Sequence, residues 1–313
     1  MERIIKISDL KSAISAVYDK YKALDIPNLA LDPRVDSVLE GRFGISMCLV
    51  DGTRYDVGDT KTLMPMGTIL RVPLYLQLLT QMPVNDLVHK MRFDKCPCGC
   101  QKDDKSVKPK GVHAKSLRMA SLVEPTGDAD GKMKIISDLM VGLMGKSPAL
   151  DDKAYEAAVK AAADNGIVNT LAEAGYELYD DTAVALDIFN RLHSMLVTTE
   201  QLAEMGATIA ADGINPVTKT PVFDGNLAAP LVAMIASKGP KKVKKNWVLT
   251  TGMPAMTSFG GALFTVMPGF GSITAMSPDL AGGHVPVRAI KALRELFEQF
   301  GLNVFASARV KAE

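Results

Sequence analysis

A chain of 313 residues can form one large domain or two modest ones, and its 47% hydrophobic and 23% charged residues are typical of an ordinary globular protein. A net charge of +1 gives no electrostatic case for binding nucleic acid or an anionic membrane surface. No apolar run is long enough to cross a bilayer, and the N-terminus lacks the apolar core of a signal peptide, so the expected compartment is the cytoplasm.

The first part of the chain is expected to form a helix, a β-hairpin and a second helix. Asp51-Gly52 lies between the two strands of the hairpin, because this dipeptide readily supplies the positive φ of a tight turn. Pro73 is compatible with the second helix only in its first turn, where its missing N–H is not needed. The expected elements cover residues 3–24, 44–50, 53–57 and 68–79.

The middle of the chain has helical patterns, and strand patterns return near the C-terminus. A capping box at Thr198-Thr199-Glu200-Gln201 predicts the start of a helix that runs through Ala211. Two further stretches, 95–111 and 149–153, are interpreted as loops. The other expected helices cover 155–174, 182–193 and 287–300, and the expected strands cover 261–266 and 272–276.

Strand patterns at both ends of the chain, with helices between them, predict one α/β (α+β) domain over residues 1–313. In this prediction a sheet part comprises about 1–66 and 240–313, and a helical part comprises about 67–239.

Several short motifs occur in a characteristic order along the chain. These motifs are Ile26-Pro27-Asn28-Leu29-Ala30, Gly58-Asp59, Leu186-Asp187-Ile188-Phe189, Gly213-Ile214-Asn215-Pro216, Gly252-Met253-Pro254-Ala255, Gly260-Gly261 and Ser277-Pro278. Their order and spacing over about residues 10–305 resemble the serine-dependent glutaminases, whose fold is that of the β-lactamases and penicillin-binding proteins. The resemblance implies a mainly antiparallel sheet with an inserted helical lobe, a small-molecule substrate, no cofactor and a homo-oligomer.

The family's Ser-x-x-Lys motif falls on Thr68-Ile69-Leu70-Arg71, so both reactive residues are replaced. In Ser-x-x-Lys the lysine takes the proton of the serine, which requires a lysine that is transiently neutral. Arg71 cannot take this role because a guanidinium keeps its proton in proteins. Thr68 is also a more hindered nucleophile than serine.

The other positions implied by the resemblance are also changed. A carboxylate that would hold the substrate ammonium is replaced by Ala158, and a proton-shuttling tyrosine is replaced by Phe189. The backbone N–H of Phe259 could still serve as an oxyanion-hole donor. The candidate substrate-binding residues are Asp25, Lys115, Asn165, Phe189 and Phe259.

These replacements lead to the hypothesis of a divergent enzyme with a rebuilt site that acts on a small anionic or amino-acid-like substrate by non-glutaminase chemistry. Arg71 would bind a carboxylate, and His113 or Thr68 would handle protons, because histidine titrates near neutral pH. Arg71 could instead form a structural ion pair with Asp25 or Asp59. Two alternatives remain: an inactive homologue with a binding or regulatory role, and a residual glutaminase or amidohydrolase.

Cys96, Cys98 and Cys100 form a cluster in which one residue separates neighbouring cysteines. Zinc sites normally separate paired cysteines by two to four residues and need four ligands, so this spacing fits a metal site poorly. A reactive thiol in this segment is a second catalytic hypothesis. Incidental cysteines in a solvent-exposed loop are the simplest interpretation.

Overall fold

The computed structural model describes residues 2–91, 114–164, 166, 169, 178–240, 244–282, 285–306 and 309–313. The chain divides into two compact units. A sheet unit contains Met1–Ile69, Asp138–Ala149 and Met195–Glu313, and a helical unit contains Leu70–Ser137 and Leu150–Ser194. That the whole chain forms a single domain stays a prediction. The sheet unit also takes in the helices after residue 195, which the sequence had placed in the helical part.

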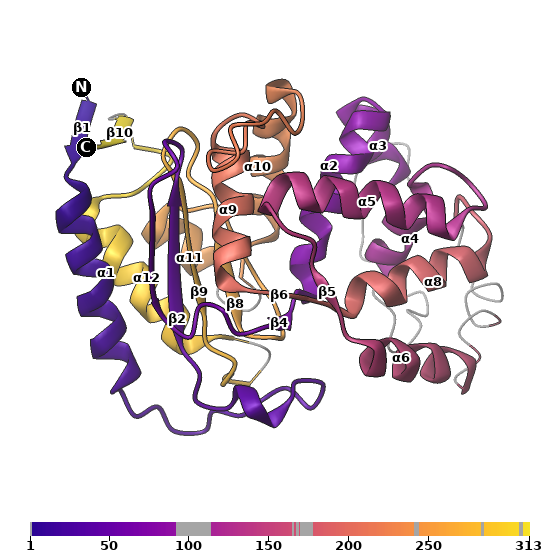
Figure 1. Cartoon of the computed structure of the whole chain (residues 1–313), viewed down its shortest axis with the longest axis horizontal. Coiled ribbons are helices and arrows are strands. Elements are labelled where there is room, and N and C mark those ends of the chain that lie inside the picture. The colour runs from indigo at the N-terminus through magenta and orange to yellow at the C-terminus, as the bar shows by residue number, and fades with distance from the viewer. Residues whose placement is uncertain are drawn as a thin grey trace. The chain divides into compact units, whose positions relative to one another are not determined.

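A five-stranded antiparallel sheet forms the centre of the sheet unit (Figure 1). In the order β3-β2-β9-β8-β7, two N-terminal strands lie beside three C-terminal strands, which confirms the prediction of a sheet built from distant parts of the chain. The strands are β2 (Gly44–Leu49), β3 (Arg54–Gly58), β7 (Ala255–Thr257), β8 (Ala262–Thr265) and β9 (Gly271–Met276).

Shorter strands and several helices complete the sheet unit. Its described helices are α1 (Ile7–Lys22), α9 (Thr199–Ala210), α10 (Ala228–Lys238), α11 (Lys244–Thr251) and α12 (Val287–Phe300). The shorter strands are β1 (Glu2–Ile5), β4 (Met64–Pro65), β6 (Met195–Val197) and β10 (Arg309–Ala312), in which β1 pairs with β10 and β4 pairs with β6.

Helices cover both faces of the central sheet, with α1 and α12 on one face and α9 on the other (Figure 1). Alternation along β2 explains this arrangement, because successive side chains of a strand point to opposite faces. Ile45 and Met47 join the main hydrophobic core that includes α1 and α12. Cys48, between Met47 and Leu49, packs against Ala203 and Ala207 of α9.

The described part of the helical unit consists mainly of helices. These are α2 (Arg71–Gln81), α3 (Val84–Lys90), α4 (Ala114–Leu122), α6 (Asp152–Asp164) and α8 (Thr182–His193), while α5 (Ala129–Met144) begins in this unit and ends in the sheet unit. Leu117 of α4 packs against Ala185, Leu186 and Phe189 of α8. This cluster buries the apolar stripe that predicted α8.

The predicted elements agree with the structure where the sequence pattern is long. Helices α8 and α12 cover 182–193 and 287–300 as predicted, and the Thr198–Gln201 capping box is present. The prediction of a loop over 149–153 was wrong, because β5 (Ala149–Leu150) and the start of α6 lie there. The predicted second helix begins as a 3₁₀ turn, η2 (Gly67–Leu70), before α2.

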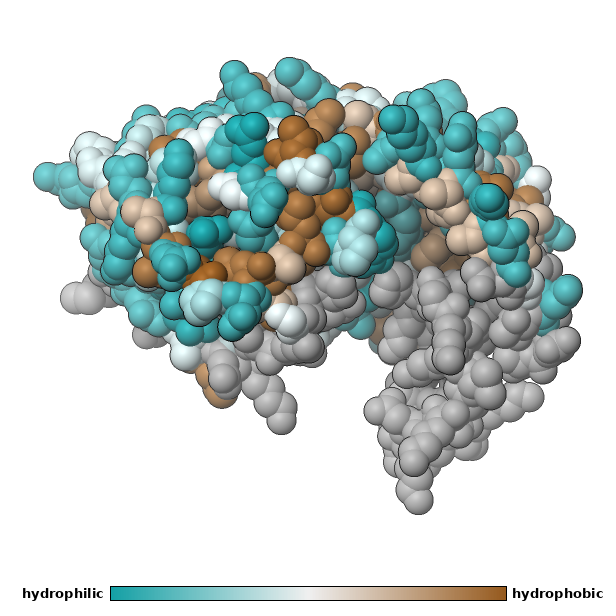
Figure 2. Space-filling model, turned by 90° about the horizontal axis from the view of Figure 1, so that it is seen from below, coloured by the Kyte–Doolittle hydropathy of each residue, from teal (hydrophilic) through white to brown (hydrophobic). Residues whose placement is uncertain are grey.

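The surface in the space-filling view is mostly hydrophilic, with apolar residues in limited areas (Figure 2). Leu249 and Phe305 are the most exposed large apolar side chains among the described residues, at 82% and 69%. No helix within the described ranges is both long enough and apolar enough to cross a bilayer.

Candidate functional site

Thr68 lies in the sheet unit, in the short η2 turn that follows β4. Its side chain is half-buried, and its Oγ1 donates a hydrogen bond of 2.5 Å to the carbonyl oxygen of Thr257, the last residue of β7. This bond connects the predicted nucleophile to the edge of the central sheet. It also means that the hydroxyl proton must leave the Thr257 carbonyl before Oγ1 can attack a substrate.

Gly67 allows the ring of Phe259 to lie directly against the backbone that precedes Thr68. Gly67 has φ +55°, and a Cβ at this position would lie 2.9 Å from Cδ1 of Phe259. An L side chain is unfavourable here both because of the left-handed backbone and because of this contact. The absence of a side chain at Gly67 therefore lets the Phe259 ring lie against the residue that precedes Thr68.

Phe259 lies in the turn between β7 and β8, and its backbone N–H has no acceptor among the residues that the structure describes. The neighbouring N–H groups of Ser258 and Gly261 donate within the turn, to Ala262 and Ser258 respectively. A backbone N–H without an acceptor among the described residues is the kind of donor that an oxyanion hole uses.

Arg34 is a neighbour of this site that the sequence analysis missed. Its guanidinium carbon lies 3.9 Å from the centre of the Phe259 ring, and its Nε and Nη2 donate to the two oxygens of Asp32 at 2.7 and 2.8 Å. This bidentate pair fixes the guanidinium over the ring. The short spacing of Asp32 and Arg34 could have indicated their ion pair. The contact of Arg34 with Phe259 joins segments that are distant in sequence, so no local pattern could have indicated it.

Arg71 lies in the helical unit as the first residue of α2. Its Nε donates to Oγ of Ser116 on α4 at 2.8 Å, and among the described residues it has no ion-pair partner. Burial lowers the pKa of Arg71, with the nearby Tyr75 acting in the opposite direction. Arginine starts from so high a pKa that the guanidinium stays charged. Asp59, one suggested partner, pairs instead with Arg42.

Phe189 and His193 lie one turn apart on α8. Phe189 is 8% exposed, its ring centre lies 3.8 Å from that of His193, and the carbonyl oxygen of Phe189 is 2.9 Å from Nδ1 of His193. The packing of Phe189 against Leu117 gives it a place in the core of the helical unit. Its predicted substrate contact stays a prediction.

The remaining sequence-predicted residues divide into two groups. Asp25 is exposed in the segment that follows α1, and the backbone of Lys115 belongs to α4. The others lie outside the described residues: His113, Asn165, Cys96, Cys98 and Cys100. Among the described candidates, the structure brings Phe259 against Gly67, next to Thr68, in the sheet unit and places Arg71 and Phe189 in the helical unit.

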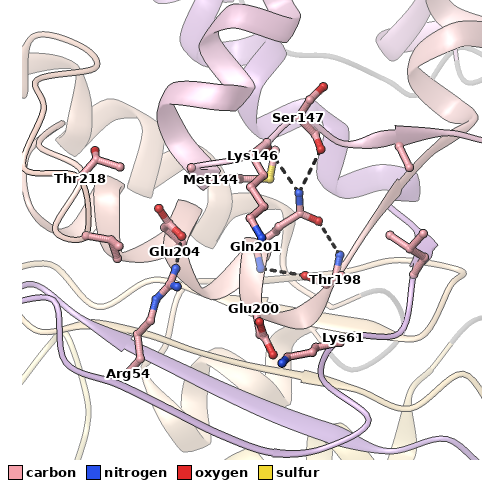
Figure 3. Close-up of a pocket in the computed structure, with 14 residues that line it drawn as sticks. Arg54, Lys61, Met144, Lys146, Ser147, Thr198, Glu200, Gln201, Glu204 and Thr218 are labelled. Atoms are coloured by element: carbon pink, nitrogen blue, oxygen red, sulfur yellow. Dashed lines mark hydrogen bonds and ion pairs between the residues drawn. The ribbon is translucent and has the colours of Figure 1, made fainter.

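A cavity of about 580 Å³ opens elsewhere in the sheet unit, and none of its lining residues contacts Thr68 or Phe259 through a hydrogen bond that the structure records (Figure 3). It is bounded by β3, by the first two turns of α9 and by the segment between α5 and β5. Charged side chains from all three segments line it, including Arg54, Lys146 and Glu204. The sequence analysis did not identify this cavity.

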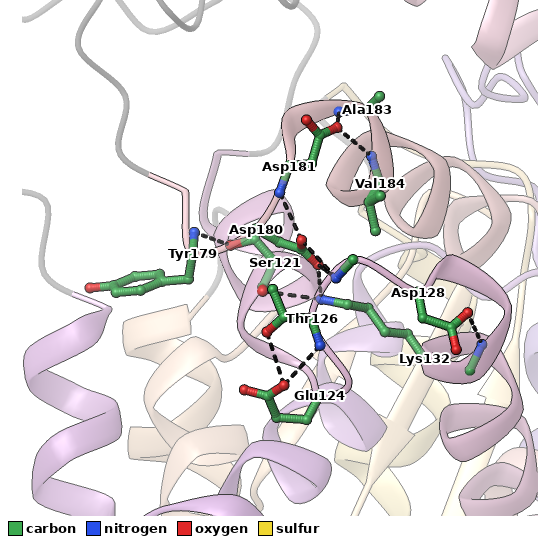
Figure 4. Close-up of polar contacts among 12 residues, drawn as sticks. Ser121, Glu124, Thr126, Asp128, Lys132, Tyr179, Asp180, Asp181, Ala183 and Val184 are labelled. Atoms are coloured by element: carbon green, nitrogen blue, oxygen red, sulfur yellow. Dashed lines mark hydrogen bonds and ion pairs between the residues drawn. The ribbon is translucent and has the colours of Figure 1, made fainter.

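A buried ion pair anchors the segment that leads into α8 of the helical unit (Figure 4). Lys132 of α5 pairs with Asp180, and the two side chains are 0% and 1% exposed. Asp180 also accepts backbone N–H bonds from Gly127 and Asp181 at 3.0 and 2.7 Å. Burial alone would raise the pKa of Asp180, but these hydrogen bonds and the Lys132 charge lower it.

Comparisons with known proteins place these features in context. The Glutaminase family model matches residues 26–305. A glutaminase of Bacteroides thetaiotaomicron is 32% identical over 314 residues, which cover 98% of each chain. A solved structure of a probable glutaminase, ybaS, superimposes with a TM-score of 0.84 at 25% identity and covers 97% of this chain and all of that one.

A more distant structure shares the fold alone. The Bacillus subtilis glutaminase YbgJ, in a covalent complex with 5-oxo-L-norleucine, has a TM-score of 0.77 at 18% identity and covers 95% of this chain and 99% of that one. These neighbours confirm the predicted α/β glutaminase-like fold with an antiparallel sheet.

The comparisons also correct one expectation. The hypothesis of non-glutaminase chemistry was wrong, because relatives aligned over nearly the whole chain are glutaminases. That hypothesis took the loss of the Ser-x-x-Lys side chains as evidence for a new reaction. A hydroxyl group is nevertheless kept at Thr68, so the replacements do not require a new reaction.

Proposed function

Because the chain belongs to the glutaminase family, we propose that it hydrolyses the side-chain amide of glutamine and releases ammonia and glutamate. The observation that supports the proposal is that the Phe259 ring lies against Gly67, the residue before Thr68, while the Phe259 backbone N–H has no acceptor among the described residues. One group supplies an oxygen nucleophile, and the other supplies a donor for the oxygen of the amide carbonyl.

In the proposed reaction, Oγ1 of Thr68 attacks the amide carbon and its proton passes to a base. The carbonyl oxygen becomes negative and accepts a hydrogen bond from the Phe259 N–H. The carbon–nitrogen bond then breaks, the nitrogen takes up a proton and leaves as ammonia, and water hydrolyses the ester on Thr68. His113 is the sequence-based candidate for the base, since histidine side chains as a class can exchange protons near neutral pH.

Arg71 keeps its sequence-based assignment to a carboxylate of the substrate. Its hydrogen bond to Ser116 supports a fixed orientation of the guanidinium, and its permanent charge suits a carboxylate. Because Arg71 cannot accept a proton and threonine is hindered, turnover should be slow for a glutaminase. A cytoplasmic location and a homo-oligomer also remain proposals, which cell fractionation and light scattering would test.

Ammonia release from L-glutamine by the purified chain tests the proposed function. Thr68→Ala should abolish release, and Thr68→Ser should increase it, because serine keeps the hydroxyl and removes the hindering methyl group. Thr80→Ala is a matched control, since Thr80 also donates from its hydroxyl to a backbone carbonyl but is exposed near the end of α2. Release that is unchanged in Thr68→Ala would contradict the proposal.

A second candidate function is binding without catalysis. Two observations favour it: the Thr68 hydroxyl is engaged by the Thr257 carbonyl, and Arg71 stands where a lysine base would be needed. This candidate predicts that L-glutamine binds, as measured by calorimetry, while no ammonia appears. Detectable ammonia release that depends on Thr68 would exclude it.

A further inference from the structure

We propose that the cavity between β3, α9 and the segment after α5 is a second small-molecule site, which binds an acidic amino acid (Figure 3). A volume of about 580 Å³ is in the usual range for a ligand pocket and leaves room for bound water beside a small ligand. The site goes beyond the proposed glutaminase activity, because it does not involve Thr68 and does not require turnover.

Glu204 lies at the floor of the cavity, and its charge is neutralised by an ion pair with Arg54. Glu204 of α9 is 4% exposed, and its two oxygens accept from Arg54 and, at 2.9 Å, from Nδ2 of Asn215. Gly145 passes so close that a Cβ there would lie 2.5 Å from Oε1 of Glu204. The floor is therefore charged but satisfied, and the backbone beside it is a glycine that adds no side chain to the cavity.

One wall is held rigid by the start of α9. Gln201 closes the capping box with Thr198, and its Nε2 also donates to the carbonyl oxygens of Lys146 and Ser147 at 3.4 and 3.3 Å. The same side chain thus fixes the helix start and the turn that carries Lys146. This connection fixes the backbone of Lys146, whose side chain lines the cavity, and, among the described residues, leaves its ammonium group unused.

The charged side chains of the cavity that are not already paired indicate which ligand would bind. Lys61 and Lys146 are exposed and have no ion-pair partner within the described ranges, and Glu200 uses one oxygen to accept a 2.8 Å bond from the Thr60 hydroxyl. Figure 3 shows Lys61 and Glu200 on the same side of the cavity. Partial burial raises the pKa of the neighbouring Asp56, and the Glu200 carboxylate adds to the increase.

The ammonium groups of Lys61 and Lys146 complement two carboxylates of a ligand, and the Glu200 carboxylate complements one ammonium. The Glu200 carboxylate would accept the ligand ammonium, while Lys146 and Lys61 would bind its carboxylates. A simple dianion lacks the group that Glu200 needs, and a neutral amino acid lacks the second carboxylate. An acidic amino acid such as L-glutamate satisfies both ends.

Isothermal titration calorimetry of the full chain with L-glutamate tests this site. Lys146→Gln should weaken one class of binding about tenfold, the effect of losing one charge-assisted contact. Lys61→Gln provides a second variant with the same expectation. Lys291→Gln, on the exposed side of α12, is the matched control and should leave binding unchanged.

Selectivity gives an independent readout. Native protein should bind L-glutamate about tenfold more tightly than glutarate, which lacks the ammonium, and Glu200→Gln should remove this preference. Equal binding of glutarate or sulfate to the native protein would overturn the assignment, as would glutamate binding that is unaffected in both lysine variants. A lack of ammonia release would contradict the proposed function but leave this binding result unchanged.

Discussion

Replacing Asp180 by asparagine is expected to destabilise the protein by about 3–5 kcal/mol, because the Lys132 ammonium would stay buried without its counter-charge. The Lys132 side chain is 0% exposed, and its other recorded acceptor is the Ser121 carbonyl oxygen at 3.2 Å. One neutral acceptor cannot replace the hydration of an ammonium, so the loss in free energy of unfolding should be at the upper end of the range for single mutations.

Lys132→Met should cost less than Asp180→Asn, about 1.5–3 kcal/mol, which is the loss of one hydrogen bond to a charged group. The Asp180 carboxylate would keep its backbone N–H bonds from Gly127 and Asp181. The order of the two variants thus follows from which partner keeps other hydrogen bonds.

Urea unfolding followed by far-ultraviolet circular dichroism would measure both free energies. Asp224→Asn is a matched control, because Asp224 is exposed and, among the described residues, accepts one local backbone N–H at 2.9 Å, so its replacement should lower the free energy of unfolding by less than about 1 kcal/mol. The reasoning fails if Asp180→Asn lies within 1 kcal/mol of the native protein, or if Lys132→Met is the more damaging change.

Three further predictions follow from individual residues. Gly67→Ala should displace the Phe259 ring and lower kcat/KM for ammonia release about tenfold or more, whereas Gly127→Ala, also at positive φ but with nothing near its Cβ, should leave kcat/KM unchanged. The stability advantage of the native protein over Asp180→Asn should be full above about pH 4 and decline as the pH falls through the lowered pKa of Asp180, as measured by urea unfolding. Trp247, the only tryptophan and fully buried, should shift its fluorescence to longer wavelength on unfolding, and an already red emission in the native state would contradict its placement.

Long periodic patterns allowed the sequence to predict the helices at 182–193 and 287–300, because each buries one continuous apolar stripe. The capping box at Thr198 was predictable because its two hydrogen bonds are local. The parallel pairing of β1 with β10 was not predictable, because it joins the two ends of the chain through four-residue strands. The two-residue strand at 149–150 was too short to show alternation.

The candidate site was predictable only in part, because its contacts also join segments that are distant in sequence. The positions of Thr68 and Phe259 came from the family resemblance, whereas the approach of the Phe259 ring to Gly67 depends on the missing side chain of that glycine. The stacking of Arg34 on Phe259 and the cavity around Glu204 arise from segments that are distant in sequence. No local spacing encodes such contacts.

Covalent labelling with 6-diazo-5-oxo-L-norleucine tests most directly whether Thr68 is the nucleophile of a glutaminase. Trypsin should release residues 62–71 as one peptide, because it cleaves after Lys61 and after Arg71. Mass spectrometry should find the 5-oxo-norleucine adduct on Thr68 in the native protein and no adduct in Thr68→Ala. An adduct on Cys96, Cys98 or Cys100, or an unmodified native protein that still releases ammonia, would contradict the assignment of Thr68.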